Sequence, residues 1–230
     1  MKVRFARLAG LASIAAFGLV ALGPIDSAAA DGVAEINQTC AIETGCFPGD
    51  PAGFPVLITA PGSYRLTSNL VMSGTSTAAI QINASRTSVD LGGFTLQGPV
   101  TCTGSGPTLA CTPTGIAPGI QSSVLAHVVS ISNGAVTGMG GGGIVLNGRQ
   151  NRIAAVRADS NGVVGILSNQ SAVITDSSAQ LNDGFGIIGG KRWACQRNAW
   201  HQQRGDRKSL YARLQAVPDH ATHFLLPPNR

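Results

Sequence analysis

The stretch NGVVGILSNQSAVITDSSAQLNDGFGII, residues 161–188, contains one pattern twice and decides the fold. In both copies an asparagine stands four residues before a Gly-Ile step: Asn161 before Gly165-Ile166, and Asn182 before Gly186-Ile187. Another Gly-Ile step, Gly143-Ile144, lies 22 residues before the first of these, and the last follows after 21 residues. A constant period of this length indicates a repeat architecture in which each unit packs against its neighbours.

The apolar residues between these steps repeat with the same offsets. Ile131, Ile153 and Ile174 form one column of equivalent residues, and Val136, Ala158 and Ala179 form another. Further upstream the match is looser, but the segments that start at Ala79 and Gly119 each place a valine ten residues on, at Val89 and Val129. We therefore expect Val89 and Val129 to be equivalent positions of two units.

Each unit contains short runs in which apolar and polar residues alternate, as at Ile80 and Ile82. Alternation at period two predicts strands of about three to five residues, with glycine and asparagine at the bends because these residues tolerate positive φ. Residues 31–190 carry no sustained helical pattern. Units this small cannot bury a core alone, but they can stack in parallel about 4.8 Å apart. The sequence therefore predicts an all-β parallel β-helix.

Two other repeat or all-β folds are weaker matches. A leucine-rich repeat has a similar period, but it needs leucines at fixed offsets and a helical return, where these units carry isoleucine, valine and glycine. The strands of a β-sandwich need not recur at a constant offset.

Three segments and the Asn-x-x-x-Gly-Ile bends resemble the secreted bacterial right-handed parallel β-helix repeat proteins of the pectin-lyase-like superfamily. The segments are FPVLITAPGSYRLTSNLVM (54–72), VDLGGFTLQGP (89–99) and NRIAAVRADSNGVVGI (151–166). The resemblance covers about residues 54–190. It implies a right-handed coil, and it says little about activity because these residues shape coils rather than perform chemistry.

The N-terminus has the pattern of an export signal. Basic residues precede an apolar run over 8–22, and SAAA ends at Ala30, where small residues fit a signal peptidase site. The run is shorter than the roughly 20 residues that a membrane-spanning helix needs. We expect cleavage after Ala30 and a secreted, periplasmic or cell-surface protein. Its parts are an N-terminal cap with the first strands over 31–77, coils over 78–190 and an atypical basic tail over 191–230.

The tail differs in composition from everything before it, because arginine, tryptophan and histidine replace glycine at Lys191. One interpretation is a short amphipathic helix starting near Asp206 that covers the open end of the coils. The other is a frameshifted reading of the gene, and further Asn-x-x-x-Gly-Ile units in another frame would support it. The tail's histidines and Cys195 match no standard metal site in spacing, so we expect no metal there.

Charge is distributed unevenly along the chain. The whole sequence has a formal net charge of +5, yet residues 31–190 hold five arginines against eight carboxylates, a net charge of −3. Nucleic-acid binding requires a clustered cationic face, so the coils do not fit that class of function.

The cysteines of an exported chain are expected to pair. Cys40 and Cys46 enclose five residues, and Cys102 and Cys111 enclose eight, so each pair can close a local loop. A four-cysteine metal site would need Cys-x-x-Cys spacing, which neither pair has.

Catalytic candidates are few. By resemblance, a pectate lyase would show several aspartates for Ca²⁺ with a basic residue, and a polygalacturonase would show Asn-x-Asp, Asp-Asp, Gly-His-Gly and Arg-x-Lys; none of the last four motifs occurs in the coils. Asp159 and Asp183 lie one coil and three positions apart, which makes them the candidate pair of carboxylates for hydrolysis. The alternative is that they cap turns as solvated bend residues.

Three other features can be assigned a role. Arg149, Arg152 and Arg157 are the candidate residues for binding an acidic glycan, or they belong to a solvated face. His127 has no carboxylate at its register, which favours a structural histidine over a general base. The glycine-rich stretch 138–144 lacks the lysine and helix of a phosphate loop, and such bends are expected in this fold.

The scarcity of catalytic groups favours a non-catalytic surface, carbohydrate-binding or structural module that needs no cofactor. The partner is then a polysaccharide. The alternatives are a polysaccharide lyase, hydrolase or epimerase, and a truncated, inactive gene product.

Overall fold

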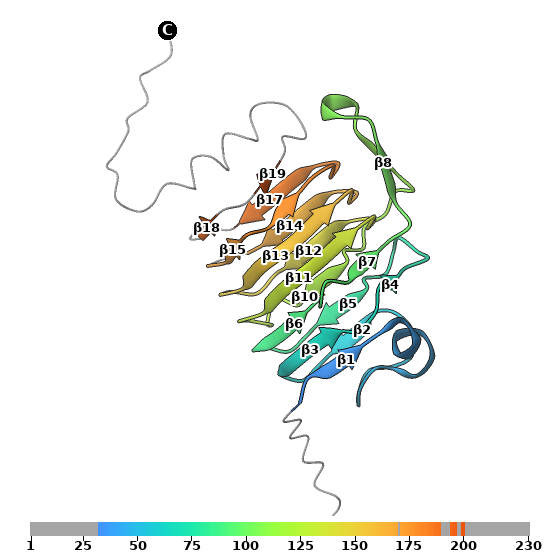
Figure 1. Cartoon of the computed structure of the whole chain (residues 1–230), viewed down its shortest axis with the longest axis vertical. Coiled ribbons are helices and arrows are strands. Elements are labelled where there is room, and N and C mark those ends of the chain that lie inside the picture. The colour runs from blue at the N-terminus through green and yellow to red at the C-terminus, as the bar shows by residue number, and fades with distance from the viewer. Residues whose placement is uncertain (1–31, 170, 190–193, 197–198, 201–230) are drawn as a thin grey trace, which may run out of the picture.

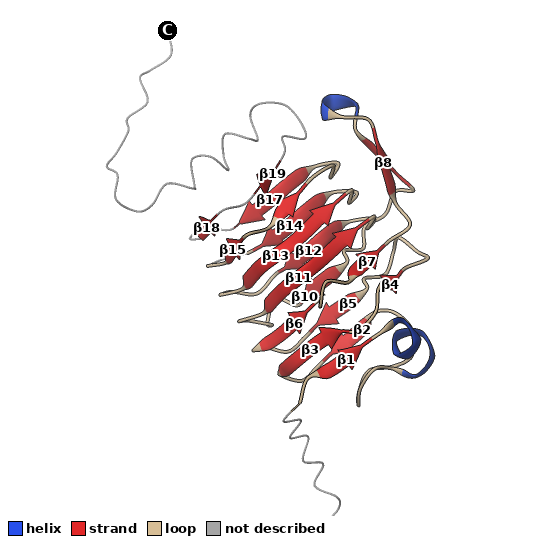
Figure 2. Ribbon diagram, viewed as in Figure 1, coloured by secondary structure: helices blue, strands red, loops and turns tan. Residues whose placement is uncertain are grey.

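The computed structural model describes residues 32–169, 171–189, 194–196 and 199–200 of the 230-residue chain. These residues form an all-β solenoid of about six turns, as the sequence predicts (Figure 1). The helical elements are a π-helix at Cys40–Thr44 and a 3₁₀ turn at Gly106–Thr108 (Figure 2). The predicted export signal and residues 201–230 of the tail, including the predicted helix near Asp206, lie outside the described residues.

Each full coil contributes one strand segment to each of three parallel rows. The first row is β2 (Val56–Ile58), β5 (Ile80–Ile82), β10 (Ile120–Ser122), β12 (Gly142–Leu146), β14 (Val164–Ser168) and β17 (Phe185–Gly189). The second row is β1 (Ala34–Ile36), β3 (Gly62–Leu66), β6 (Thr87–Asp90), the first parts of β11 (Ser130–Thr137) and β13 (Arg152–Asp159), β15 (Val173–Thr175) and β18 (Ala194–Gln196). The third row is β4 (Leu70–Val71), β7 (Thr95–Gln97), the last parts of β11 and β13, β16 (Ser178–Ala179) and β19 (Ala199–Trp200).

The predicted register between the later coils is confirmed. Ile131 pairs with Ile153 and Ile153 with Ile174, so this column runs through three coils. The Gly-Ile steps also stack, because Ile144 pairs with Ile166 and Ile166 with Ile187. Five of these six isoleucines are fully buried, and the sixth, Ile187, packs against the same core. The parallel pairing continues to Trp200, past the predicted end of the coils at residue 190.

The expected equivalence of Val89 and Val129 is wrong. Val89 pairs with Ile131, while Ile80 pairs with Ile120 as the alignment of the two segments requires. The connection between the two strands is therefore two residues longer in the later coil. Both valines are buried, so hydrophobicity alone could not reveal the shift.

The corners of the coils contain backbone in the left-handed region, but glycine and asparagine are not its main residues. Three columns of equivalent residues have positive φ: Arg86, Val128, Gln150 and Ser171; Asn133, Ala155 and Asp176; Gly138, Ser160 and Leu181. At Ala155 this conformation breaks the alternation of β13, so that Ile153 and Val156 both face the core. The bends fall where the sequence predicts them. The predicted reason for their residue types holds at Gly92, Gly93, Asn133 and Gly138, while other residue types adopt positive φ at the remaining corners.

At the bends before β14 and β17, asparagine acts through hydrogen bonds of its side chain rather than through its backbone conformation. Asn161 and Asn182 are fully buried, and the side-chain oxygen of each accepts a backbone N–H from the coil beneath, Met139 N–H at 3.1 Å and Asn161 N–H at 2.9 Å. Their amide nitrogens donate to backbone carbonyls of that coil, those of Val136 and Ala158. The two side chains are also hydrogen-bonded to each other at 2.9 Å. Buried polar groups of the corner are thereby satisfied.

The glycines of the first two Gly-Ile steps, Gly143 and Gly165, make room for this asparagine ladder. A Cβ at Gly165 would lie 2.7 Å from the amide nitrogen of Asn182 and 2.7 Å from the carbonyl oxygen of Gly186. A Cβ at Gly143 would lie 2.9 Å from the amide nitrogen of Asn161. The spacing of asparagine and glycine that identified the repeat therefore reflects a contact between successive coils.

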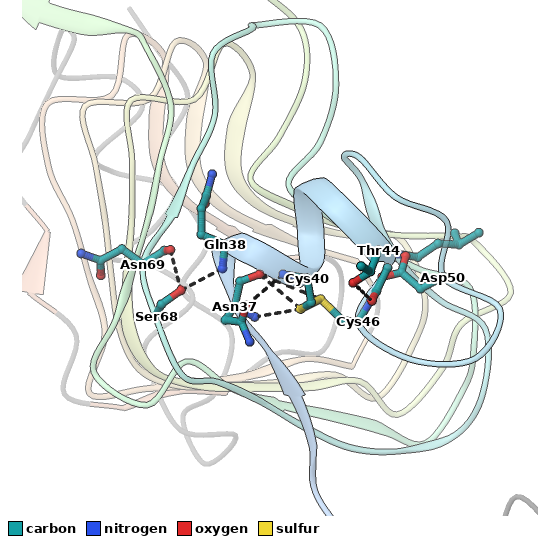
Figure 3. The surroundings of a disulfide bond; sticks show 10 residues. Asn37, Gln38, Cys40, Thr44, Cys46, Asp50, Ser68 and Asn69 are labelled. Carbon is teal, nitrogen blue, oxygen red and sulfur yellow. Dashed lines mark hydrogen bonds between the residues drawn. A yellow bond between two sulfur atoms is a disulfide. The ribbon is translucent and has the colours of Figure 1, made fainter.

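The first coil is closed by an N-terminal cap, residues 34–55. The side-chain amide of Gln38 accepts the N–H of Val71 at 2.7 Å and donates to the Val71 carbonyl at 3.1 Å. These are the bonds that another strand would make to the outer edge of β4. The backbone N–H of Gln38 donates to Ser68 Oγ, which Figure 3 shows beside the π-helix. An amide side chain thus blocks the strand edge, which limits edge-to-edge association.

Both predicted cysteine pairs are disulfide-bonded. Cys40 and Cys46 close the loop of the cap, where Asp50 accepts the N–H groups of Cys46 and Leu57 (Figure 3). Cys102 and Cys111 join β8 (Thr101–Thr103) to β9 (Ala110–Thr112), an antiparallel hairpin. Loops of this size contribute about 2–3 kcal/mol each to stability.

The substitution Gly165→Ala should destabilise the protein by about 2 kcal/mol, because the added methyl group overlaps the ladder and a backbone carbonyl. Chemical denaturation measures the free energy of unfolding. Gly74→Ala is the control, since a Cβ there meets nothing within 4 Å, and it should change stability by less than about 0.5 kcal/mol. Equal effects of the two substitutions would contradict the packing argument.

The substitution Asn161→Ala should lower the free energy of unfolding by roughly 3 kcal/mol, because it removes the side-chain partners of the Met139 N–H and the Val136 carbonyl in the coil beneath, and of the Asn182 side chain in the coil above. Asn83→Ala is the matched control: this asparagine is exposed and bonds to the neighbouring Gln81 side chain. If both variants melt like the wild type, the ladder does not hold the coils together.

Candidate functional site

The outer surface of the third row of strands is largely polar from β7 onward, whereas β4 exposes Val71. Along β7, β11, β13 and β16 the inward residues Leu96, Val136, Ala158 and Ala179 are buried. The outward positions form two columns that run along the solenoid axis. We call the polar residues of these columns the polar face: Thr95, Gln97, Thr137, Arg157, Asp159, Ser178 and Gln180.

Asp159 and Arg157 lie at the centre of the polar face. Arg157 Nε is 3.2 Å from a carboxylate oxygen of Asp159, and 66% of the arginine side chain is exposed. The other carboxylate oxygen accepts the N–H of Gln180 from the next coil at 2.9 Å. Burial raises the pKa of the Asp159 carboxyl, and the Gln180 N–H and the Arg157 guanidinium offset only part of this effect.

The structure places Asp183, the other candidate carboxylate, in the bend before β17. Its backbone N–H donates to the carbonyl of Asn161 at 3.0 Å. Asp90 and Asp159 each accept a backbone N–H at a bend, from Gly92 and from Gln180. The Asp90 contact, to a residue two positions on, is that of a turn-capping aspartate, whereas the Asp159 contact joins two successive coils. No group of three or more His, Cys, Asp and Glu side chains suited to a metal ion occurs within the described part of the chain.

The three candidate arginines belong to one coil but not to one column. Arg152 and Arg157 lie on either side of the bend at Ala155, so Arg152 faces outward from the second row and Arg157 from the third. Arg149 precedes both in the loop between β12 and β13. All three are exposed. Of the three, Arg157 belongs to the polar face.

His127 has a structural position between coils. Its ring Nδ1 accepts the N–H of Arg149 at 3.1 Å, and its own N–H donates to Ser85 Oγ at 2.9 Å. Its backbone carbonyl accepts the N–H of Arg86 at 2.9 Å. These bonds connect three coils, which is the structural role that the sequence favours.

The glycine-rich stretch 138–144 receives an arm of the chain, residues 98–118, which contains the β8–β9 hairpin and rises along the side of the stack (Figure 1). A Cβ at Gly140 would lie 2.8 Å from the Cα of Gly115, and the N–H of Gly141 donates to the carbonyl of Ala117. The N–H of Gly138 donates to Ser160. Glycine is needed here for close approach of two backbones, and these N–H groups are already engaged, which argues against a phosphate loop.

A hollow of about 630 Å³ lies on the N-terminal cap. Its lining is uncharged: Asn37, Gln38, Thr39, Cys40, Thr44, Thr67 and Ser68. The Gln38 amide and the Ser68 hydroxyl are already bonded within the cap, so these groups serve closure of the first coil.

Sequence reasoning found Arg157 and Asp159 but missed the rest of the polar face. Thr95, Gln97, Thr137, Ser178 and Gln180 are common polar residues without a motif. The signal that could have found them is the outward phase of the period-two alternation, read across coils in the correct register.

Comparisons of the chain with protein-family models, with curated proteins and with solved structures find no match. The class of protein rests on the structure itself, which is a parallel β-helix. Within the described ranges, no helix has the length and apolar character needed to cross a membrane.

The substitution Asp159→Asn should change the pH dependence of stability. The native carboxyl has its pKa raised above the ordinary value of 3.8, so the native state holds this proton more tightly than the unfolded state. The wild type therefore loses stability relative to Asp159→Asn as the pH rises above about 3.8 through the native pKa. Denaturation of both proteins from pH 3 to pH 7 measures the difference, and a difference that stays constant with pH would contradict the assignment.

Proposed function

We propose that the protein is an exported member of the pectin-lyase-like β-helix group that binds an acidic polysaccharide without cleaving it. The observation that carries this proposal is the polar face, where hydroxyl, amide and guanidinium groups recur at outward positions along the axis. Successive coils lie about 4.8 Å apart. An extended chain lying along the axis would meet at least one outward polar side chain at each coil from β7 to β16.

Arg157 supports an acidic rather than a neutral polysaccharide. Its guanidinium is the positive group of the polar face, and its side chain is more exposed than that of Asp159, at 66% against 22%. The ion pair with Asp159 engages the Nε atom of the guanidinium. A carboxylated sugar can bind such a planar group with two hydrogen bonds.

The contacts of the aspartates favour binding over catalysis. The Asp159 carboxylate is bonded on both oxygens, to Arg157 and to the Gln180 N–H. A general acid needs access to the bond that it protonates, and a second carboxylate at roughly 5–9.5 Å. The raised pKa of Asp159 is the one observation that favours the enzyme alternative.

A panel of acidic and neutral polysaccharides, followed by both binding and product formation, tests the proposal. The wild type should bind acidic members and release no shortened or unsaturated sugars. Arg157→Gln should weaken binding about fivefold through loss of a charged hydrogen bond. Arg65→Gln is the matched control, because Arg65 is also exposed and lies 3.9 Å from a carboxylate, that of Asp90, but on the second row.

Two results would contradict the proposal. Equal affinity of Arg157→Gln and Arg65→Gln for the acidic polysaccharide would rule out the polar face as the binding site. Release of cleaved sugars that stops in Asp159→Asn would establish the enzyme alternative.

A further inference from the structure

The loop between β10 and β11, residues 123–128, is longer than its counterparts in the coils on either side. Ile82, Ser122 and Leu146 are equivalent, and so are Ser88, Ser130 and Arg152. Between these fixed positions the same corner is formed by the loops 83–86, 123–128 and 147–150. The middle loop therefore contains two more residues than its neighbours.

The added length projects aliphatic side chains into solvent. Val124 and Leu125 are 67% and 76% exposed. They occupy the centre of a turn closed by a hydrogen bond from Ala126 N–H to the Ser123 carbonyl at 3.2 Å. Turn centres favour glycine, proline, asparagine, aspartate and serine, so the turn itself does not explain two aliphatic residues. Val128, which is 47% exposed and has a φ of 59°, is a third exposed aliphatic residue in the same loop.

Bonds to the adjacent coils hold this loop in place. The carbonyl of Leu125 accepts the Ser85 hydroxyl at 3.1 Å, and the N–H of Val128 donates to the Arg149 carbonyl at 2.9 Å. The three bonds of His127 to Ser85, Arg86 and Arg149 add to these. The aliphatic turn is thus a fixed projection and loses little conformational entropy when it binds.

Positive charge surrounds the projection. Arg86 is equivalent in position to Val128 in the coil beneath, and Arg149 is bonded to His127 from the coil above; both arginines are exposed. Arg152 follows at the start of β13, also exposed. The loops 59–61, 83–86, 123–128 and 147–150 contain no carboxylate, although residues 31–190 carry a net charge of −3. This corner is therefore a basic area on an acidic body.

We propose that the Val124–Leu125 turn, together with Arg86 and Arg149, docks the protein on an anionic lipid surface. Aliphatic side chains at a tip can enter the boundary between headgroups and acyl chains, and arginines beside them attract lipid phosphates. An acidic polysaccharide would satisfy the arginines but would offer nothing to the two aliphatic side chains. This surface lies at the corner between the first and second rows, apart from the polar face on the third.

Vesicle sedimentation tests this proposal with the full chain, using phosphatidylcholine alone and an equimolar mixture with phosphatidylglycerol. The wild type should bind the anionic vesicles more tightly. The double variant Val124→Ser/Leu125→Ser should bind them about tenfold more weakly. Arg86→Gln and Arg149→Gln should each cost about fivefold. Because all variants share residues 1–30, any contribution of that apolar segment cancels in the comparison.

Matched controls come from exposed residues elsewhere. Ile116→Ser removes an aliphatic side chain that is 84% exposed on the arm, and Arg65→Gln removes a charge from the second row. Both should bind vesicles like the wild type. The turn variant should also keep its thermal unfolding and its polysaccharide binding, which separates this proposal from the function of the polar face. Failure of the wild type to prefer anionic vesicles, or equal binding by the turn variant and the wild type, would overturn it.

Discussion

At the corner that leads into the first row of strands, the amide side chains of Asn161 and Asn182 are buried and bonded to the coil beneath. Strand pairing alone satisfies the flat parts of a coil but not the corner, where backbone groups turn inward. The ladder provides those partners, and it needs glycine at Gly143 and Gly165 because a methyl group would occupy its space. In the later coils this contact accompanies the stacking of the Gly-Ile steps, in which Ile144 pairs with Ile166 and Ile166 with Ile187.

A stack of coils must also be closed at its ends, since the outer edge of a terminal strand exposes unbonded backbone. At the N-terminal end, the Gln38 amide makes both bonds to Val71 that a further strand would make. The disulfide of Cys40 and Cys46 and the buried Asp50 shape the loop that carries this glutamine. At the other end, strands continue to Trp200, so strand pairing does not stop where the composition changes.

Because coil residues alternate between the core and solvent, the same register that builds the core also arranges the outer surface. The polar face is a consequence of this register. Thr137 and Gln180 belong to no motif, but they form part of one polar surface because they lie in line with Arg157 and Asp159. The corner at 123–128 shows the complementary case, in which an insertion leaves the core register intact and changes only what the surface presents. Loops of a repeat protein can vary in this way because the stacked strands hold their ends.

The sequence by itself determined the repeat and the all-β class, because a constant offset of apolar residues leaves few alternatives. It indicated that the cysteines could pair locally, and the structure decided the connectivity. It also located the bends at Asn161 and Asn182, although it assigned them a backbone role. Only the tertiary structure decided that these asparagines form a buried ladder, that the candidate arginines face different rows, and that the arm covers the glycines of 138–144. Each of these depends on which coil lies against which, and a loop two residues longer, as at 123–128, shifts the sequence offset between two coils while the strands on either side keep their pairing.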